Sequence, residues 1–406
     1  MNIENKRPPK MKLPRFIAVD FFCGAGGTTR GLIDAGGYVI AGIDKDARVA
    51  RTYRENNRND TLDRAEPVFL EKDVFAQTRA YPSGQQEQLK VELRQLIFRA
   101  KKMARKIPLL FAICAPCQPF TTLSKKALTE ERRQGRKKDR GLLREATKFV
   151  EKFKPDLILS ENVAGIDEDR YGGVWQTFKR RLGDLGYVTG TKVVDAYRFG
   201  IPQYRKRSIL IAVRRPLASR YRRGDGLELL VPEADPDSEI VAVQDAIGHF
   251  PRVGPGQSHP EIPNHRTRTL SELNQKRLSC AKPGETNAYM EKTEFGDLTL
   301  ECHKRVIKKF SRRGFGDVYT RMRPDRPAPT ITTRCHSISN GRFGHFDTSQ
   351  IRGISLREAA ALQSFPDNYV FYPTDQLEPV ARMIGNAVPP KLARFFANYL
   401  VSTSSR

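Results

Sequence analysis

The first half of this 406-residue chain has no histidine, because all six lie from His249 onward. A catalytic base in that half must therefore be another residue type. No uninterrupted apolar stretch approaches the roughly 20 residues of a membrane-spanning helix, so we expect no membrane association. The first fifteen residues are basic and proline-rich but have no apolar segment, and we expect no secretory signal.

Cysteine is also scarce and irregularly placed. The six cysteines show no regular spacing, which is typical of reduced thiols in a cytoplasmic protein and not of a disulfide framework. Cys114 and Cys117 form a CxxC, so a redox or zinc site is an alternative to consider. No second CxxC exists, and the pairs Cys302-His303 and Cys335-His336 lack the usual ligand spacing.

Acidic residues are too few to balance the basic ones. The chain has 71 Lys and Arg against 46 Asp and Glu, a formal net charge of +25. Such an excess indicates a polyanionic partner, because each neutralised phosphate releases counterions. Residues 125–140 alone carry eight basic and three acidic side chains, so this loop is a candidate lid over phosphates.

Apolar strands alternate with helices through the first half of the chain. This pattern predicts an α/β fold with a parallel sheet covered on both faces and an antiparallel pair at one edge. The expected strands are 16–22, 38–44, 67–73, 109–114, 156–162, 187–196 and 208–213, and the expected helices include 85–106, 174–185 and 355–364. Ser355 and Glu358 form a capping box for the last of these.

Turn signals replace periodic runs after Arg214. We therefore expect a catalytic domain over 1–213, completed by a C-terminal helix in 380–406. A smaller, irregular domain is expected over 214–379.

Chemically useful residues follow the predicted strands. Cys117 comes after the apolar run 109–114, and Glu161 ends the strand 156–162. A glycine-rich turn follows the first strand, and the next two strands end at Asp44 and Asp73. The carboxyl edge of a parallel sheet is where α/β folds bind ligands, so these groups are expected to share one site.

Taken in order, these motifs resemble those of the DNA (cytosine-5) methyltransferase family. The resemblance covers roughly residues 16–213 and 318–400. The matching blocks are Phe22-Cys23-Gly24 with Gly26-Gly27, Pro116-Cys117-Gln118, Asp139-Arg140-Gly141-Leu142-Leu143, Glu161-Asn162-Val163, Gln203 with Arg205 and Arg207, Arg357-Glu358-Ala359-Ala360, and Gly385-Asn386. The variable part between them corresponds to the family's target recognition domain.

The resemblance implies a Rossmann-like sheet that binds S-adenosylmethionine and methylates C5 of cytosine within a specific double-stranded DNA sequence. Cys117 would attack C6 of a flipped-out base, Glu161 would hold N3 and the amine, and Arg205 would clamp the base and orient Glu161. Arg207 would support Arg205, and Gln203 belongs to the same motif. The cofactor would be lined by Phe22, Gly24, Gly26, Gly27, Asp44, Asp73, Val74, Pro116, Leu143 and Asn386.

Two features depart from the family pattern. Asp44 stands where many members have Glu, and the stretch between Asp73 and Cys117 is longer than in compact members, which leaves the role of the helix 85–106 open.

Two alternatives within this resemblance remain: a catalytically dead DNA-binding relative, and a tRNA-methylating relative. Intact Cys117, Glu161 and Arg205 argue against the first. The long segment from Arg214 to about Asp325 and the lack of a Cys-Phe-Thr tripeptide argue against the second.

We further expect a monomer that is associated with the nucleoid. It would act as the methylase of a restriction–modification system, with a cognate endonuclease as its genetic partner, or as an orphan or phage enzyme. Candidate DNA contacts through base edges or phosphates are Arg321, Arg323, Arg334, Asn340 and Arg342, with the segment 337–341.

Overall fold

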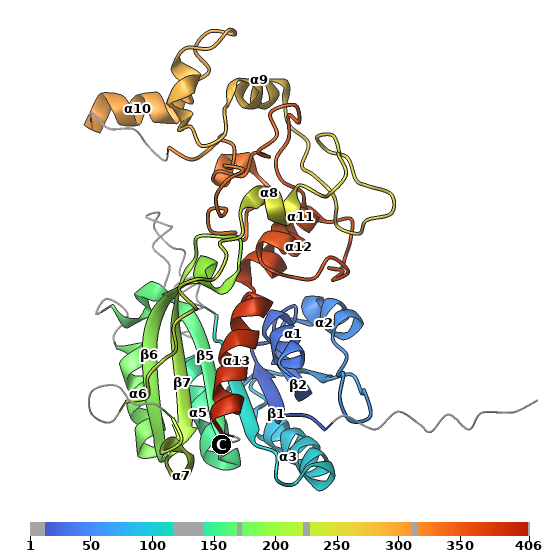
Figure 1. Cartoon of the computed structure of the whole chain (residues 1–406), viewed down its shortest axis with the longest axis vertical. Helices are drawn as coiled ribbons and strands as arrows, with labels where there is room; N and C mark the ends of the chain where they lie inside the picture. The colour runs from blue at the N-terminus through green and yellow to red at the C-terminus, as the bar shows by residue number, and fades with distance from the viewer. Residues whose placement is uncertain (1–12, 117–140, 169–172, 222–227, 311–315, 405–406) are drawn as a thin grey trace, which may run out of the picture.

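A seven-stranded mixed sheet forms the centre of the larger lobe (Figure 1). The computed structural model describes residues 13–116, 141–168, 173–221, 228–310 and 316–404. The strand order is β3-β2-β1-β4-β5-β7-β6, with only β7 antiparallel to its neighbours. The strands are β1 Phe16–Phe21, β2 Gly37–Asp44, β3 Val68–Glu71, β4 Leu109–Ile113, β5 Leu157–Val163, β6 Tyr187–Asp195 and β7 Lys206–Arg214.

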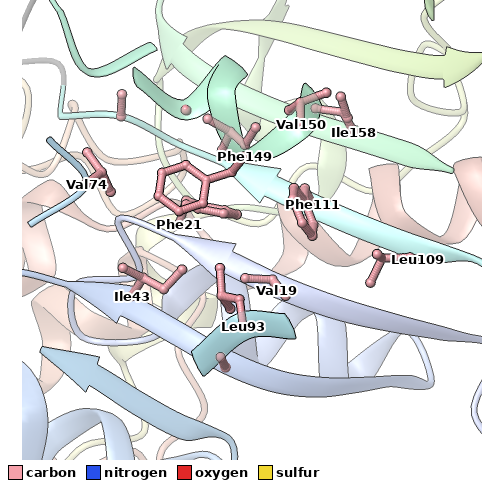
Figure 2. Close-up of a cluster of buried hydrophobic side chains, with 14 of the residues drawn as sticks. Val19, Phe21, Ile43, Val74, Leu93, Leu109, Phe111, Phe149, Val150 and Ile158 are labelled. Atoms are coloured by element: carbon pink, nitrogen blue, oxygen red, sulfur yellow. The ribbon is translucent and has the colours of Figure 1, made fainter. Parts of the chain in front are cut away.

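Helices cover both faces of this sheet. One face packs against α3 (Gln86–Met103), α5 (Leu142–Phe153) and α6 (Val174–Asp184). Figure 2 shows this core, with Phe21, Phe111 and Phe149 at its centre. The other face packs against α1 (Gly27–Asp34) and α13 (Pro390–Ser404). Successive side chains of each strand point to opposite faces of the sheet, so each strand contributes to two separate apolar layers.

The expected α/β class, the seven strands and the antiparallel edge pair are confirmed, with ends shifted by one or two residues. The helix expected at 85–106 is α3, which buries Leu89, Leu93 and Ala100 and leaves Met103 exposed. The capping box at Ser355 is present in α11 (Leu356–Leu362): the Ser355 hydroxyl accepts from the Glu358 amide, and the Glu358 carboxylate accepts from the Ser355 amide.

The single C-terminal helix expected over 380–406 is wrong. Two helices lie there, α12 (Leu377–Asn386) and α13, separated by residues 387–389. The pair Pro389-Pro390 explains the break, because Pro389 has no amide hydrogen and its ring disfavours a helical residue before it. Pro390 suits the first position of the new helix.

A second core joins the sheet lobe to the smaller lobe. It contains Tyr53 of α2 (Ala50–Asn56) and Ala25 of the glycine turn, together with apolar residues of α11, α12 and α8 (Val243–Ile247). Tyr369 of the smaller lobe donates to the Ala25 carbonyl at 2.5 Å and accepts from the Asn57 amide at 3.1 Å. The two lobes thus share buried surface on the side of α2.

The outer part of the smaller lobe is irregular, as expected. Its short helices are α9 (Glu272–Cys280) and α10 (Glu301–Phe310). The short helix α7 (Arg215–Ala218), which follows β7, lies instead against β6 and β7 in the larger lobe (Figure 1). In the outer part of the smaller lobe, where helices and strands are scarce, a buried arginine side chain satisfies backbone carbonyl groups. Arg321 donates to the carbonyls of Leu278, His345, Thr348, Asp347 and Gln350. One fully buried guanidinium therefore ties α9 and residues 345–350 to the segment that carries Arg321.

Candidate active site

The end of β4 is fastened to β5 by side-chain hydrogen bonds. Ser160 donates its hydroxyl to the Ile113 carbonyl at 2.5 Å, and Asn162 donates its amide to the Ala115 carbonyl at 3.0 Å. Both side chains are fully buried. They fix the direction in which the chain leaves the sheet toward Cys117. Cys117 itself and the basic loop 125–140 lie outside the described residues.

Glu161 lies on β5 with its carboxylate facing Arg207 of β7. The Glu161 Oε1 and Arg207 Nε atoms are 2.7 Å apart, and both side chains are about nine-tenths buried. The register explains the pair: Glu161 lies opposite Ile209, so Arg207 is its diagonal neighbour on the same face of the sheet. Because water is largely excluded from this ion pair, the attraction between the two charges is stronger than at the surface.

Arg205 does not hold Glu161, contrary to our expectation. Its guanidinium donates to the carbonyls of Ile331, Gly385 and Ala387. Residues 203, 205 and 207 are nevertheless buried together, while residues 204 and 206 are exposed. The partner that braces Glu161 is therefore Arg207, and Arg205 braces the segments around Ile331 and Gly385.

Gln203 is likewise turned inward. Its amide donates to the Leu362 carbonyl at 2.9 Å and to the Gln363 side chain, and its oxygen accepts from the Ile331 amide at 3.1 Å. Gln363, which the sequence analysis did not single out, donates to the Ile384 carbonyl at 2.7 Å. Gln203 and Gln363 thus connect the start of β7 to the ends of α11 and α12.

The glycine turn between β1 and α1 has the backbone expected of a ligand cradle. Phe22, Gly24 and Gly26 have positive φ angles of 62°, 50° and 93°. A Cβ at Gly26 would lie 2.4 Å from the Asn57 amide, whereas a Cβ at Gly24 would meet no atom of the described residues within 4 Å. Gly26 is therefore needed for packing, while the open space over Gly24 lets a ligand approach the backbone.

Carboxylates lie beside this turn. Asp44 accepts hydrogen bonds from the amides of Gly24 and Asp46, both at 2.9 Å, and burial raises its pKa. Asp73 is buried after β3 and accepts from the Phe75 amide at 3.1 Å. Carboxylate oxygens accept more than one hydrogen bond, so both can still bind hydroxyl or amino groups of a ligand.

The other predicted cofactor residues lie at different depths. Val74 and Leu143 belong to the apolar core below the sheet edge, with Leu143 in the first turn of α5. Gly27 begins α1, where a Cβ would lie 2.4 Å from the Val388 carbonyl. Pro116 and Asn386 are exposed, and Asn386 ends α12.

Asp20 is a buried acid that the sequence analysis missed. It is fully buried on β1 and accepts from the Thr29 hydroxyl at 2.7 Å, and the Thr29 hydroxyl lies 3.1 Å from that of Tyr53. Burial raises the pKa of Asp20 to about 7. The signal for it is an acid inside an apolar strand immediately before the glycine turn.

The candidate DNA contacts separate into buried and exposed groups. Arg321 is fully buried, so the prediction that it contacts DNA is wrong. Arg342 is mostly enclosed and bonds to the Glu285 carbonyl and Asp317. Arg323, Arg334 and Asn340 are exposed, and Arg323 forms an ion pair with Asp325 at 2.7 Å.

The redox and zinc alternative receives no support. Burial raises the pKa of the Cys114 thiol well above its usual value, which disfavours the reactive thiolate. Within the described ranges, no group of three or more His, Cys, Asp or Glu side chains could hold a metal ion.

In the same part of the chain, no helix has both the length and the apolar composition needed to span a bilayer.

Comparisons with known proteins agree with this geometry. Residues 86–402 match the family model for C-5 cytosine-specific DNA methylases. The type II methylase M.HgiDII of Herpetosiphon aurantiacus is 35% identical over 381 residues, which cover 93% of each chain. The type II methyltransferase M1.HphI of Haemophilus parahaemolyticus is 27% identical and covers 95% of this chain and 87% of its own.

Solved structures show the same fold at low sequence identity. The methyltransferase EhMeth of Entamoeba histolytica superposes with a TM-score of 0.55 at 12% identity, covering 96% of this chain and 97% of that one. An E. coli prophage protein described as a DNA modification methyltransferase reaches 0.64 at 20% identity, covering 96% of this chain and all of its own.

Proposed function

The chain belongs to the C-5 cytosine-specific DNA methylase family, and from that premise we propose that Cys117 is its nucleophile and that Glu161 and Arg207 act as its partner pair. The enzyme transfers a methyl group to C5 of cytosine in a specific DNA sequence and takes it from S-adenosylmethionine. The observation that supports the proposed roles best is the buried 2.7 Å pair of Glu161 and Arg207 at the sheet edge that leads to Cys117.

The chemistry requires these residue types. C5 of cytosine is a weak nucleophile, and attack of a thiolate on C6 makes C5 electron-rich enough to take the methyl group. Negative charge then develops at N3, where Glu161 in its protonated form donates a hydrogen bond and stabilises the adduct. Loss of the C5 proton and β-elimination of Cys117 restore the aromatic ring. A stacked duplex gives no access to C6, so the base is flipped out first.

The described residues fit the cofactor. The open space over Gly24 admits the ligand close to the backbone, and we assign Asp44 and Asp73 to its hydroxyl and amino groups. Phe22, Val74, Pro116 and Leu143 supply apolar surface, and Gly26, Gly27 and Asn386 complete the pocket. Arg205 and Gln203 act indirectly by holding the segments around Ile331 and Ile384.

A restriction–modification role is the best-supported biological context, because M.HgiDII and M1.HphI are both described as type II enzymes. We propose a monomer that acts on chromosomal DNA in the cytoplasm, with a cognate endonuclease as its genetic partner. We also propose the division into a catalytic domain over 1–213 with the C-terminal helices and a target-recognition domain over 214–379.

Methylation sequencing of DNA from a host that expresses the protein tests this function. We expect 5-methylcytosine at one fixed position of one sequence for the wild type. Cys117→Ser is expected to leave the DNA unmethylated while it still binds S-adenosylmethionine. Methylation by that variant, or methyl transfer to tRNA but not to duplex DNA, would contradict the proposal.

A further inference from the structure

Tyr204 keeps its ring at the surface although its backbone is fixed from both sides. The residue is 44% exposed. Its amide donates to the Ala328 carbonyl at 2.7 Å, and its carbonyl accepts from the Thr330 hydroxyl at 2.6 Å. Since both partners belong to the smaller lobe, Tyr204 lies where the two lobes meet. A tyrosine held in this way has little conformational freedom left to lose when a ligand binds it.

A second tyrosine and an arginine lie beside this ring. The Tyr197 and Tyr204 rings meet edge to face, with centroids 5.2 Å apart. Tyr197 belongs to the short helix η5 (Ala196–Phe199), which follows β6. The guanidinium carbon of Arg198 lies 5.4 Å from the centre of the Tyr197 ring, which is within the range of a cation–π contact. These contacts bring a cation and an exposed phenol to one patch of the surface.

Lys206 lies on the same side of the chain as Tyr204. It begins β7, and residues 204 and 206 are exposed while Arg205 between them is buried. Side chains two residues apart in an extended segment point the same way. The tyrosine patch, as we call this part of the surface, consists of Tyr197, Arg198, Tyr204 and Lys206.

The polar groups of the tyrosine patch are free to bind a ligand. Three of its four side chains are exposed and the fourth is half-buried. Among the residues that the structure describes, its two cations form no ion pair and its two phenol hydroxyls have no hydrogen-bond partner. Asp195 lies opposite the lysine in the sheet register, and Glu233 is already paired with Lys192. Two cations beside one unpaired acid leave the patch with a net positive charge.

The tyrosine patch borders the site of the target base. Because β7 runs antiparallel to β5, the first residues of β7 lie at the edge of the sheet where β5 ends. Arg207, next to Lys206, is the 2.7 Å partner of Glu161. In Figure 1 this end of β7 is the one nearer the smaller lobe. A flipped-out base stays attached to its sugar and phosphates, so the strand that carries it must pass close to this edge.

We propose that the tyrosine patch binds the sugar–phosphate backbone of the DNA strand that carries the target cytosine. The inference rests on the proposed function, because that strand passes here only if Glu161 binds the base. Tyr204 donates its hydroxyl to a phosphate oxygen and packs its ring against the sugar, while Tyr197 supports the ring. Arg198 and Lys206 neutralise phosphates. Such contacts position the duplex and carry no sequence information of their own.

A double-mutant cycle between protein and DNA tests the contact of Tyr204. The variant Tyr204→Phe keeps the ring and loses the donor, so its affinity for the methylated sequence should fall about tenfold, as for a hydrogen bond to a charged group. Duplexes with a single neutral methylphosphonate, placed at each position of either strand in turn, are then compared by fluorescence anisotropy. At the phosphate that Tyr204 binds, the methylphosphonate should weaken binding by the wild type and have little further effect on Tyr204→Phe.

Two results of this cycle would overturn the proposal. The first is that the effects of Tyr204→Phe and of the methylphosphonate simply add at every position, which means that the hydroxyl contacts no phosphate. The second is coupling at positions of the complementary strand alone. The matched control is Tyr372→Phe, because Tyr372 also lies beside an arginine, with the Arg51 guanidinium 4.0 Å from its ring centre, but on the α2 side of the molecule. That variant should bind DNA as the wild type does.

The salt dependence of binding tests the two cations. Each neutralised phosphate contributes about 0.9 to the slope of log K against log salt. Arg198→Ala with Lys206→Ala should lower the slope by about 0.9 if both cations meet one phosphate, and by about 1.8 if they meet two. An unchanged slope would exclude them from the contact. Arg99→Ala with Lys102→Ala removes the same charge from exposed positions of α3 and should leave the slope nearly unchanged.

Failure of this contact can be distinguished from failure of the proposed function. Binding of S-adenosylmethionine shows that each variant folds. DNA affinity requires no methyl transfer, so these measurements stay valid even if Cys117 is not the nucleophile. Methylation of the unmodified duplex by the wild type is measured separately and reports on the enzyme's proposed function.

Discussion

At the scale of single residues, the site depends on which arginine faces Glu161. The motif contains Arg205 and Arg207 on one face of the chain, and alternation alone cannot say which one reaches the acid. Strand register decides, because β7 runs antiparallel to β5 and brings Arg207 diagonally opposite Glu161. Arg205 lies before β7 begins, and there its guanidinium donates a hydrogen bond to the Ile331 carbonyl.

We expect Arg207→Ala to lower kcat roughly 100-fold, since loss of the pair leaves Glu161 free to turn away from the base. Glu161→Gln should cost roughly as much or more, with DNA binding retained. The matched control is Arg214→Ala on the same strand, where the partner Asp156 lies 3.6 Å away, and its kcat should stay near that of the wild type. Single-turnover methyl transfer to duplex DNA measures all three. An unchanged rate in Arg207→Ala would remove its role.

Asp20 makes the stability of the protein depend on pH. Its folded-state pKa of about 7 lies above the value of 3.8 for an exposed acid, so folding favours the protonated form. Below pH 3.8 Asp20 is protonated in both the folded and the unfolded state and costs no stability. As pH rises from 3.8 to about 7, the unfolded state ionises first, and the free energy of unfolding falls. The total loss is roughly 4 kcal/mol.

Asp20→Asn should remove this loss, because an amide stays neutral and can still accept from the Thr29 hydroxyl. The free energy of unfolding of the variant, compared with wild type by urea titration, is expected to improve steadily from pH 4 to pH 7. Asp34→Asn, at an exposed position of α1, should follow the wild-type curve. A constant difference between Asp20→Asn and wild type at every pH would contradict the assignment.

At the scale of helices and strands, apolar periodicity and turn residues predicted the sheet and its helices closely. Buried strands such as β4 are continuous apolar runs, and little else competes with that pattern. The C-terminal break has a local signal, Pro389-Pro390, which our single-helix prediction overlooked. What has no local signal is the way the turn at residues 387–389 is held, because Arg205 and Gln363 donate to the Ala387 carbonyl from distant elements.

Gly385 shows how closely these elements approach one another. A Cβ there would lie 2.3 Å from the Thr332 carbonyl carbon and the Thr333 amide nitrogen, so Gly385→Ala must push α12 away from that segment. We expect a loss of stability of roughly 1–3 kcal/mol and a higher KM for S-adenosylmethionine, because Asn386 moves with the helix.

Gly183→Ala is the matched control for this change. Gly183 also lies in a helix, α6, but a Cβ there would have no neighbour within 4 Å among the residues that the structure describes. That variant should gain roughly 0.5–1 kcal/mol from helix propensity. Thermal unfolding and initial rates over a range of cofactor concentrations distinguish the two. Equal Tm values for both variants would refute the close approach.

At the scale of the whole molecule, the two lobes are expected to unfold together. Their shared core includes Tyr53 and Ala25 on one side and Leu356 and Ile384 on the other. Across the same interface, the Asn56 side chain donates to the Val370 carbonyl and accepts from the Val370 amide, and the Thr52 hydroxyl accepts from the Tyr372 amide. Calorimetry should therefore show a single transition. Two well-separated transitions would mean that the interface adds little to stability.

The excess of basic residues predicted a polyanionic partner, but it could not identify which arginines contact DNA. Arg321 was a candidate, yet its side chain is fully buried inside the smaller lobe. Charge counts predict the class of ligand, while burial decides which charges remain available for it.

The most direct test of the central claim is covalent trapping. DNA with 5-fluorocytosine at the methylated position is incubated with the enzyme and S-adenosylmethionine, and the products are measured by mass spectrometry. Fluorine cannot be eliminated as a proton is, so we predict a protein–DNA adduct attached to Cys117 and none with Cys117→Ser. Absence of any adduct from an enzyme that methylates ordinary DNA at the same position would contradict the account.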